Sequence, residues 1–427
     1  MVAMDAVVKG RALLDSGLTD CCIGIDDGKI VRIAKVIERA DRRFDFSGRL
    51  ILPAGVDLHV HFRDPGMTHK EDFETGSMAA AAGGVSFVID MPNTRPPTRT
   101  PSDAEEKLKL ASKKSYVDFG VAALLDERTD VPKVSKLASA FKAYLGETTG
   151  GLGIDAERMP ELLSDVKDAG IPTFVHAEHV GPLEERLERN LVDHDRRRSQ
   201  KLEVEAVGAV LKARPPGTRI HILHVTQAEI LAMTEDVEGL TTEVTPHHLL
   251  LDTDMDLGTR GKINPPLRSK KTRAALWEAF SKGLNDTLGS DHSPHTIDEK
   301  EEDLDAAPSG MPGVETMMPL MLKRVADRKL DLRILSTALS ERPAEILGIS
   351  KGRIRQGYDA DLIVVDFART MDIRADKLHS KCGWTPYEGW EAIFPEFVMI
   401  GGNEVARFGN ITGERCGRAH RPGGENR

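Results

Sequence analysis

Short apolar runs alternate with longer amphipathic stretches through the middle of this chain, and this alternation restricts the possible folds more than any other feature. Eight such runs, rich in β-branched residues, span 56–60, 85–91, 116–124, 140–145, 172–178, 220–225, 242–248 and 287–292. Helical patterning fills most of the intervals between them. Eight strand–helix alternations over about 240 residues predict an α/β fold whose parallel strands close into a (β/α)8 TIM barrel. A doubly wound open sheet is the structural alternative.

The two ends of the chain have a different pattern of apolar and polar residues. The first fifty residues read as short strands joined by turns at residues 26–28 and 47–48, and a similar pattern returns after residue 350. We therefore expect residues 1–52 and 345–427 to form one small β-sandwich domain, built from both termini, beside a barrel of residues 53–344. The last dozen residues combine Gly, Pro and charge without periodicity, which predicts a frayed end.

Charge and cysteine content narrow the class of protein. The 427 residues include 58 Lys and Arg against 68 Asp and Glu, a net charge of −10 that argues against nucleic-acid and membrane-surface partners. The 4 cysteines form no CxxC pair, which suits a reducing cytosol and lacks the spacing of thiolate metal sites. Neither a signal peptide nor an apolar run of about 18 residues is visible. We expect a soluble, cytoplasmic protein.

Histidines and one aspartate mark the ends of four of the expected strands. His59 and His61 lie two residues apart at the end of the first strand, so both side chains face the same side. His176, His224 and Asp291 end three later strands. The carboxyl ends of barrel strands meet at one mouth, so these side chains should converge. Nitrogen and oxygen ligands without sulfur favour Zn²⁺, with Mn²⁺ or Co²⁺ as alternatives.

Several short motifs occur in a fixed order along the same region. They are GVDLHVHFRDPG, DMPNTRPPT, FKAYLGETTG, VHAE, HILHVT, EVTPHHL, INPPLR and GSDHSPHT, with weaker support from KCGWTPYEGW and FVMIGGNEV near the C-terminus. Together they resemble the cyclic amidohydrolase superfamily, and within it the dihydroorotase family of archaeal and bacterial type. The resemblance implies reversible cyclisation of N-carbamoyl-L-aspartate to (S)-dihydroorotate and water, in de novo pyrimidine (UMP) biosynthesis. A homo-oligomer would be typical of the family.

The resemblance also implies a centre with two Zn²⁺ ions. His59, His61 and Asp291 would hold the more buried ion, and His176 and His224 would hold the second. Lys142 matches a position at which relatives carry a lysine carbamate, formed with CO₂, that bridges the two ions. An unmodified ammonium would be repelled by two dications, whereas a carbamate is anionic and offers two oxygens. Some relatives have an aspartate at or near this position, and an ordinary exposed lysine is the other alternative.

Catalysis in the family implies a water made nucleophilic by the two metals and a carboxylate that moves its proton. A hydroxide that bridges the ions would attack the ring carbonyl. Asp291 would accept the proton and return it to the leaving ring nitrogen, and in the synthetic direction the steps run backwards.

Other residues match family positions that contact the substrate, which is an anion in both its open and its ring form. Arg63, Asn93 and His295 match the positions for the substrate carboxylate, and Arg63 can bind a carboxylate through two donors. A salt bridge from Arg63 to the adjacent Asp64 is the ordinary alternative. Further matches near the pyrimidine ring are Asn264, Ser309 and Gly310.

Alternative functions can be weighed against the same motifs. An allantoinase or a hydantoinase would share the metal ligands, but the MPNT motif and His295 favour dihydroorotase. A catalytically inactive homologue that scaffolds a partner enzyme would have lost metal ligands, and none of the expected ligands is missing here. We expect His247 and His248 to have a packing role, His69 to contact a loop, and the acidic stretch 298–305 to form a solvated face.

Overall fold

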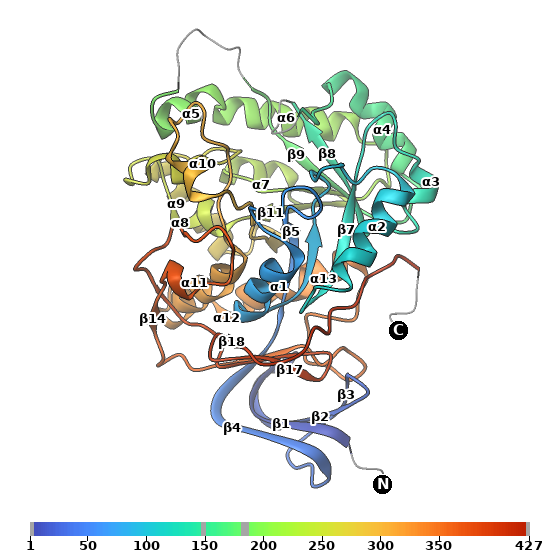
Figure 1. Ribbon diagram of the computed structural model, residues 1–427, viewed down its shortest axis with the longest axis vertical. Helices are drawn as coiled ribbons and strands as arrows, with labels where there is room; N and C mark the ends of the chain where they lie inside the picture. Colours follow the sequence, from blue (N-terminus) through green and yellow to red (C-terminus); the bar gives the residue numbers. More distant parts are fainter. Residues whose placement is uncertain (1–3, 147–150, 181–187, 424–427) are drawn as a thin grey trace.

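A parallel barrel forms the larger part of the molecule in the computed structural model, which describes residues 4–146, 151–180 and 188–423 (Figure 1). Its strands pair in chain order and all in parallel. They are β5 (Gly55–Val60), β6 (Val85–Asp90), β7 (Asp118–Leu124), β8 (Ala140–Leu145), β9 (Thr173–Ala177), β10 (Ile220–Ile222), β11 (Leu240–Val244) and β12 (Thr287–Leu288). The predicted eight-stranded α/β barrel is confirmed.

Closure of the barrel excludes the open-sheet alternative. Beyond the end of β12, His292 pairs in parallel with Val60 of β5. The His61 amide donates to the His292 carbonyl oxygen at 2.8 Å, so the last strand segment bonds to the first. The ring of hydrogen bonds therefore has no free edge, and the strand ends meet around one mouth.

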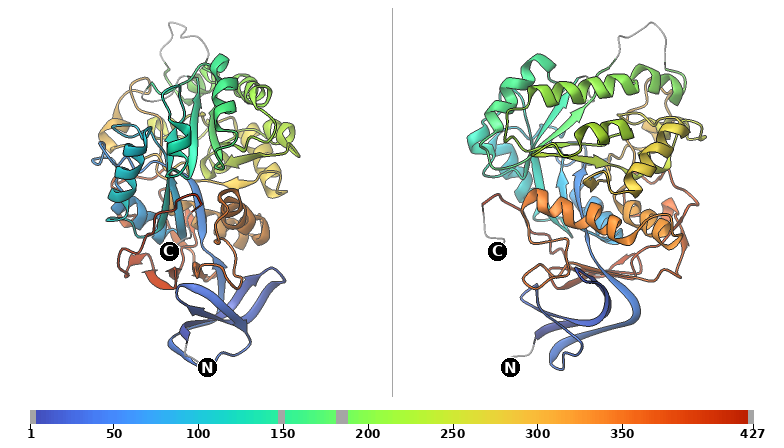
Figure 2. Two further views of the ribbon diagram at one scale, coloured as in Figure 1. Left: turned by 90° about the vertical axis from the view of Figure 1, so that its right-hand side faces the viewer. Right: turned by 180° about the vertical axis from the view of Figure 1, so that it is seen from behind.

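Helices surround the strands on the outside, as Figure 2 shows from two sides. They are α1 (Phe73–Ala82), α2 (Pro101–Ala111), α3 (Val131–Val134), α4 (Met159–Val166), α5 (Leu191–Arg197), α6 (Gln200–Ala213), α7 (Ala228–Thr234), α8 (Pro246–Leu250), α9 (Lys270–Ser281), α10 (Ile297–Glu301), α11 (Val314–Ala326), α12 (Leu332–Ser336) and α13 (Arg342–Leu347). Short helical turns η1 (Ala156–Arg158), η2 (Gly258–Gly261) and η3 (Thr337–Glu341) lie between the barrel elements, and η4 (Ala375–Lys377) lies in the C-terminal part of the chain. No helix in the described ranges is long and apolar enough to cross a lipid bilayer.

Local sequence explains where such helices begin. At α2, the Thr100 side chain accepts from the Asp103 amide, and the Asp103 carboxylate accepts from the Thr100 amide. This reciprocal capping satisfies donors that a helix start leaves free, and Pro101 occupies the position where no amide hydrogen is needed. Strands β5 to β8 are buried along their whole length because the helices cover their outer faces.

Both ends of the chain build a second sheet, as the sequence predicts. It contains β1 (Met4–Leu14), β2 (Gly17–Asp26), β3 (Lys29–Ala34), β4 (Ala40–Pro53), β13 (Leu362–Val365), β16 (Phe397–Ile400), β17 (Asn403–Arg407) and β18 (Asn410–Ile411). The order is β18-β17-β16-β13-β4-β1-β2-β3, one continuous sheet with its own apolar core. Its long N-terminal strands curve below the barrel in Figure 1. Strands β14 (Met371–Asp372) and β15 (Glu391–Ala392) form a separate pair.

The exact division of the chain stays a prediction. Strand β4 ends at Pro53, and α13 spans the proposed boundary between residues 344 and 345.

The expectation of a frayed C-terminus is wrong for residues 415–420. The Phe119 amide donates to the Arg418 carbonyl at 3.0 Å, and the His420 amide donates to the Phe119 carbonyl at 2.7 Å. Arg418 also pairs with Asp118 at 3.1 Å. Because backbone hydrogen bonds to β7 hold this segment, its lack of side-chain periodicity gave no warning that it is ordered. Residues 424–427 lie outside the described residues.

Candidate active site and metal centre

A polar cavity lies at the carboxyl ends of the barrel strands and holds about 50 Å³ of free volume. Residues that line it come from every part of the barrel sequence: His59, His61, Arg63, Asn93, Lys142, Tyr144, His176, His224, Asn264, Asp291, Ser293, Ser309 and Gly310. Eleven of the twelve predicted site residues are among them. The twelfth, His295, contacts Arg63 at its edge. Residues 147–150 of the FKAYLGETTG motif lie outside the described residues.

His59, His61 and Asp291 form one compact group. The two histidine Nε2 atoms are 3.3 Å apart, and Asp291 Oδ1 lies 3.4 Å from Nε2 of His59 and 3.2 Å from Nε2 of His61. On the other side of each ring, His59 Nδ1 lies 2.9 Å from Glu243 Oε1 and His61 Nδ1 lies 2.6 Å from Asn93 Oδ1. These oxygens place the ring protons on Nδ1 and leave both Nε2 lone pairs facing Asp291.

Such an arrangement fits a cation. Three acceptor atoms that face one another within 3.4 Å repel each other unless a positive charge lies among them. Burial lowers the pKa of both His59 and His61, so protonation of the rings is disfavoured as a way to relieve this repulsion. Two imidazole nitrogens and one carboxylate oxygen are a donor set that suits Zn²⁺.

His176 and His224 form a second group beside the first. His176 Nδ1 lies 2.9 Å from His224 Nε2, and the rings of His59 and His224 have centroids 5.3 Å apart. Glu178 accepts from His176 Nε2 at 3.2 Å and is itself paired with Arg198. Within the described residues, the buried Nδ1 of His224 has no hydrogen-bond partner. These nitrogens are therefore also available to a metal ion.

Lys142 is buried at the same cavity. Its side chain is about 1% exposed, and its Nζ lies 4.8 Å from the centre of the Tyr144 ring. In the part of the chain that the structure describes, no carboxylate pairs with this amine. Burial lowers the pKa of Lys142 to about 7, and burial raises the pKa of Asp291. The chain thus places an amine that loses its proton easily within a ring of potential metal ligands.

Arg63 faces the cavity rather than the surface. Its Nη2 donates to Ser293 Oγ at 2.8 Å and lies 3.2 Å from His295 Nε2. The alternative of an Arg63–Asp64 salt bridge is wrong, because Asp64 pairs with Lys114 at 2.7 Å. Among the residues that the structure describes, no carboxylate is paired with Arg63, and a guanidinium directed into a cavity in this state is suited to an anionic ligand.

Two loops bring Asn264, Ser309 and Gly310 to the cavity, and Lys300 donates to backbone carbonyls of both loops. Ser309 Oγ donates to Asn264 Oδ1 at 3.1 Å. Behind them, Lys300 Nζ donates to the carbonyls of Pro308 at 2.9 Å and Gly310 at 3.2 Å. Lys300 is almost completely buried, so the expectation that 298–305 is simply a solvated face is wrong at this residue. Its neighbours in sequence are acidic, so the sequence pattern did not indicate that this lysine faces inward.

Backbone conformation sharpens the turn at several of these strand ends. Arg63, His224 and Asp291 have positive φ angles of 60°, 40° and 42°. Non-glycine residues rarely adopt this region, and such strain persists where surrounding structure enforces it. The polar residues at the mouth therefore occupy positions that the barrel imposes at a cost in local conformation.

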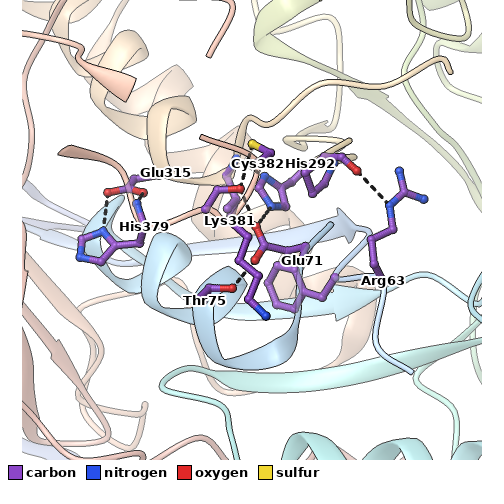
Figure 3. Close-up of polar contacts among 12 residues, drawn as sticks. Arg63, Glu71, Thr75, His292, Glu315, His379, Lys381 and Cys382 are labelled. Atoms are coloured by element: carbon purple, nitrogen blue, oxygen red, sulfur yellow. Dashed lines mark hydrogen bonds and ion pairs between the residues drawn. The ribbon is translucent and has the colours of Figure 1, made fainter. Parts of the chain in front are cut away.

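His292, next to Asp291, belongs to a buried network that the sequence interpretation missed. Its Nδ1 accepts from the Gly313 amide at 3.1 Å, so its Nε2 carries the proton and donates to Glu71 at 3.3 Å. Ser380 also donates to Glu71, at 2.5 Å. Figure 3 shows the Glu71 carboxylate next to His292, with Lys381 and Cys382 of the segment 379–384 nearby. The network connects that segment to the residue adjoining Asp291.

Glu243 was also missed. It is completely buried in β11 and accepts from His59 Nδ1 and from the His224 amide, so it contacts both ligand groups. Burial opposes its ionisation, but His59 and His221 lower the pKa of Glu243 to about 2. A charged residue inside an otherwise buried strand was the available signal. His248 has the expected packing role, with Thr245 and the Pro265 carbonyl on its two ring nitrogens.

Comparisons with known proteins identify the family to which this chain belongs and agree with its fold. The model of the amidohydrolase family matches residues 50–405, and the chain therefore belongs to that family. Within it, the chain is 42% identical to a dihydroorotase of Methanosarcina mazei over 92% of each chain, and 36% identical to one of Halobacterium salinarum over 93% and 96%. The structure is similar to that of L-hydantoinase (dihydropyrimidinase) from Arthrobacter aurescens, with a TM-score of 0.92 and 29% identity over 97% and 99% of the two chains.

Proposed function

We propose that this chain is a dihydroorotase, which interconverts N-carbamoyl-L-aspartate and (S)-dihydroorotate in de novo pyrimidine synthesis in the cytoplasm. The observation that carries the proposal is one cavity in which four histidines, Asp291 and Lys142 adjoin the inward-facing guanidinium of Arg63. The histidines, Asp291 and Lys142 suit metal-assisted hydrolysis of a cyclic amide. The Arg63 guanidinium suits binding of a carboxylate on that ring. The dihydroorotases to which the chain is similar support the same reaction.

In this proposal the ligand groups hold two Zn²⁺ ions. His59, His61 and Asp291 would hold one, and His176 and His224 would hold the other. Supporting this assignment, the nitrogens of each histidine pair lie within 3.3 Å of each other, and Asp291 lies 3.2 Å from His61. When bound, the ions would supply Lewis acidity to the amide carbonyl and lower the pKa of a coordinated water.

Lys142 would serve as a carbamate between the two ligand groups. Supporting this role are its burial and its position without a carboxylate partner in the described part of the chain. An amine must lose its proton before it reacts with CO₂, and the new N–C bond then carries a carboxylate. We expect Lys142→Ala to lower occupancy of the second metal position, measured as zinc per protein by elemental analysis. Undiminished occupancy in that variant would contradict the role.

Asp291 would move the proton. Its carboxylate would take a proton from the attacking water at Oδ2, because Oδ1 faces His59 and His61 at the proposed metal position, and would return it to the ring nitrogen when the carbon–nitrogen bond breaks. Burial, which raises the pKa of Asp291, assists a group that must accept a proton for part of the cycle. The reverse sequence closes the ring of the open substrate.

The remaining cavity residues would bind the substrate. Arg63 would donate to its carboxylate, with His295 and the Asn93 amide nitrogen as further donors. Asn93 Oδ1 already faces His61, so its nitrogen is the group left for substrate. Asn264, Ser309 and Gly310 would contact the ring.

Hydantoinase or allantoinase activity is the alternative, and the similarity to a solved L-hydantoinase favours testing it directly. The test supplies N-carbamoyl-L-aspartate, dihydroorotate, hydantoin and allantoin separately to zinc-loaded protein. We expect turnover of the first two at a kcat/KM at least about 100-fold above the others, because a buried guanidinium left without a carboxylate is costly. Preferential turnover of hydantoin or allantoin would overturn the assignment. Loss of all turnover on chelation and its return with zinc would exclude the inactive-scaffold alternative.

A further inference from the structure

Tyr144 lines the cavity near the end of β8, yet neither the proposed metal centre nor the proposed substrate contacts include it. Side chains two residues apart in a strand face the same side, so Tyr144 points into the barrel together with Lys142. The centre of its ring lies 4.8 Å from Lys142 Nζ and 6.1 Å from the centre of the His176 ring. The tyrosine ring is therefore a wall of the cavity beside the proposed ligand groups.

The hydroxyl group of Tyr144 is unmatched. It is buried, and within the described residues it has no hydrogen-bond partner. Three residues that line the cavity carry a hydroxyl group, and the other two have protein partners: Ser293 accepts from Arg63, and Ser309 donates to Asn264. Most buried hydroxyl groups in proteins are hydrogen-bonded, because burial without a partner costs free energy. The unmatched group thus needs an explanation other than packing.

Charges at the cavity act on the same hydroxyl group. Burial and the carboxylate of Asp291 raise the pKa of Tyr144 above its ordinary value, although the Arg63 guanidinium opposes the shift. A phenol already keeps its proton near neutral pH, so the Tyr144 hydroxyl can donate a hydrogen bond there. Because Arg63 and Asp291 both line the cavity, a ligand that contacts either of them comes close to this donor.

We propose that Tyr144 is a further substrate-binding residue, whose hydroxyl group donates a hydrogen bond to an oxygen of the substrate. This inference rests on the proposed function. Both forms of the proposed substrate carry carboxylate and carbonyl oxygens, which are acceptors. Binding would give the hydroxyl group the partner that the protein does not provide, at the expense of stability in the ligand-free protein.

The first test measures that stability and needs no turnover, so it remains decisive if the proposed reaction is wrong. Tyr144→Phe removes the hydroxyl group and keeps the ring that packs beside Lys142 and His176. We expect the zinc-loaded variant to unfold at a temperature equal to or above that of the unmodified protein, because no hydrogen bond within the protein is lost. Unfolding at a clearly lower temperature would overturn the proposal, since it would show that the hydroxyl group has a structural partner.

The second test measures ligand affinity. In an Asp291→Asn background, where the proposed turnover is suppressed, calorimetry gives the Kd of N-carbamoyl-L-aspartate directly. We expect Tyr144→Phe to raise this Kd about five- to tenfold, as loss of one hydrogen bond to a ligand does. Tyr387→Phe is the matched control, because Tyr387 is also buried but packs against Trp390 and does not line the cavity.

An unchanged Kd in Tyr144→Phe, or an equal increase in Tyr387→Phe, would overturn the proposal. Turnover of hydantoin or allantoin in place of dihydroorotate would contradict the proposed function alone, and the same comparison would then be made with that compound. A Kd raised only by Tyr144→Phe would support the role of Tyr144 there as well. Failure of all four compounds to bind the zinc-loaded protein would overturn both proposals.

Discussion

Single side chains in the cavity owe their orientation to the groups behind them. Glu243 fixes the tautomer of His59, Asn93 fixes that of His61, and Glu178 fixes that of His176. Each oxygen holds a ring proton on the side away from the cavity, which leaves the other nitrogen free. The ligand set is therefore preorganised by its neighbours, and those neighbours are open to mutation without removing a ligand.

Glu243→Gln tests this preorganisation. The amide keeps the size of the side chain but removes the charge that binds the Nδ1 proton of His59. We expect zinc affinity to fall about 10- to 100-fold, measured by competition with a chelator. Glu238→Gln, at an exposed position just before the same strand, is the control. Wild-type affinity in Glu243→Gln would show that the contact does not support the ligand.

Asp291→Asn tests the proton transfer. An amide oxygen can still face a metal ion, but it cannot accept a proton at the pH of the reaction. We expect the metal content to stay close to that of the unmodified protein and kcat to fall about 10²- to 10⁴-fold. Asp256→Asn, at an exposed position, should change neither. Near-normal turnover in Asp291→Asn would remove Asp291 from the mechanism.

How far the sequence predicts the site differs from residue to residue. His59, His176, His224 and Asp291 were predictable because each ends a strand, and strand ends of a barrel share one mouth. Glu71 was not predictable, since its contact with His292 joins two loops more than 200 residues apart and depends on the final geometry of both. The residues nearest the chemistry were thus the easiest to find, and their supporting residues were the hardest.

At the scale of elements, the segment around residues 379–384 lies against the N-terminal turn of α11 and connects it to the mouth of the barrel (Figure 3). Glu315 of α11 accepts from the His379 backbone amide at 2.7 Å and from its Nδ1 at 2.8 Å. Burial works against a charged imidazole, but the hydrogen bond and charge of Glu315 raise the pKa of His379 above its ordinary value. We therefore expect docking of this segment to weaken as pH rises through the pKa of His379.

His379→Gln tests that dependence. A histidine whose pKa is raised on folding stabilises the fold below its unfolded-state pKa, and this contribution is lost as pH rises through the folded-state pKa. We expect the variant to lose about 1 kcal/mol of stability near pH 6 and clearly less near pH 8.5, measured by denaturant unfolding. His69→Gln, at an exposed position, is the control. A loss that stays constant across this pH range would contradict the pairing.

Elements with regular patterning followed the sequence, and those without it did not. All eight barrel strands overlap predicted apolar runs, because burial on both faces requires continuous apolar sequence. The run 242–248 is an exception in extent, since its last three residues begin α8. The order of segment 415–420 was not predicted. Backbone hydrogen bonds to β7 hold it, and such bonds do not depend on the side chains, so they leave no pattern in the sequence. The same limit applies to 379–384, in which polar contacts of His379 and Ser380 accompany the buried side chains of Cys382 and Trp384.

At the scale of the whole molecule, a buried charge cluster joins the barrel to the terminal sheet. Lys351 Nζ lies 2.8 Å from Asp118 of β7, 3.0 Å from Asp359 and 2.6 Å from Asp361, just before β13. All four side chains are buried. Burial disfavours the ammonium, but the three carboxylates raise the pKa of Lys351.

Lys351→Met tests what this junction contributes. Removing Lys351 leaves Asp361 without its ammonium partner, whereas Asp118 and Asp359 keep Arg418 and Lys29 beside them. Breaking a buried pair in this way costs about 3–5 kcal/mol. We expect a lower thermal unfolding temperature and, below it, an unchanged kcat, because the cluster lies apart from the cavity. Lys329→Met, at an exposed position, should alter neither. An unfolding temperature equal to that of the unmodified protein would show that the junction is held by other contacts.

The architecture of the whole molecule was largely predictable from the pattern of apolar and polar residues along the chain. The alternation predicted the barrel, and short-strand patterning at both ends predicted a shared sheet. The sequence did not predict that the eight terminal strands form one continuous sheet, because the order across β4 and β13 depends on pairing between residues about 310 positions apart. Local patterns indicate elements, whereas long-range pairing decides how two ends of a chain share them.

The convergence of distant residues on one cavity that holds two metal ions and the substrate carboxylate is the central claim, and anomalous X-ray diffraction tests it most directly. Crystals of zinc-loaded protein, grown with N-carbamoyl-L-aspartate, should show two zinc peaks. One should lie at Nε2 of His59 and His61, the other at His176 and His224, with density extending from Lys142 between them and a carboxylate on Arg63. Zinc outside this cavity, or a substrate carboxylate bound away from Arg63, would contradict the account.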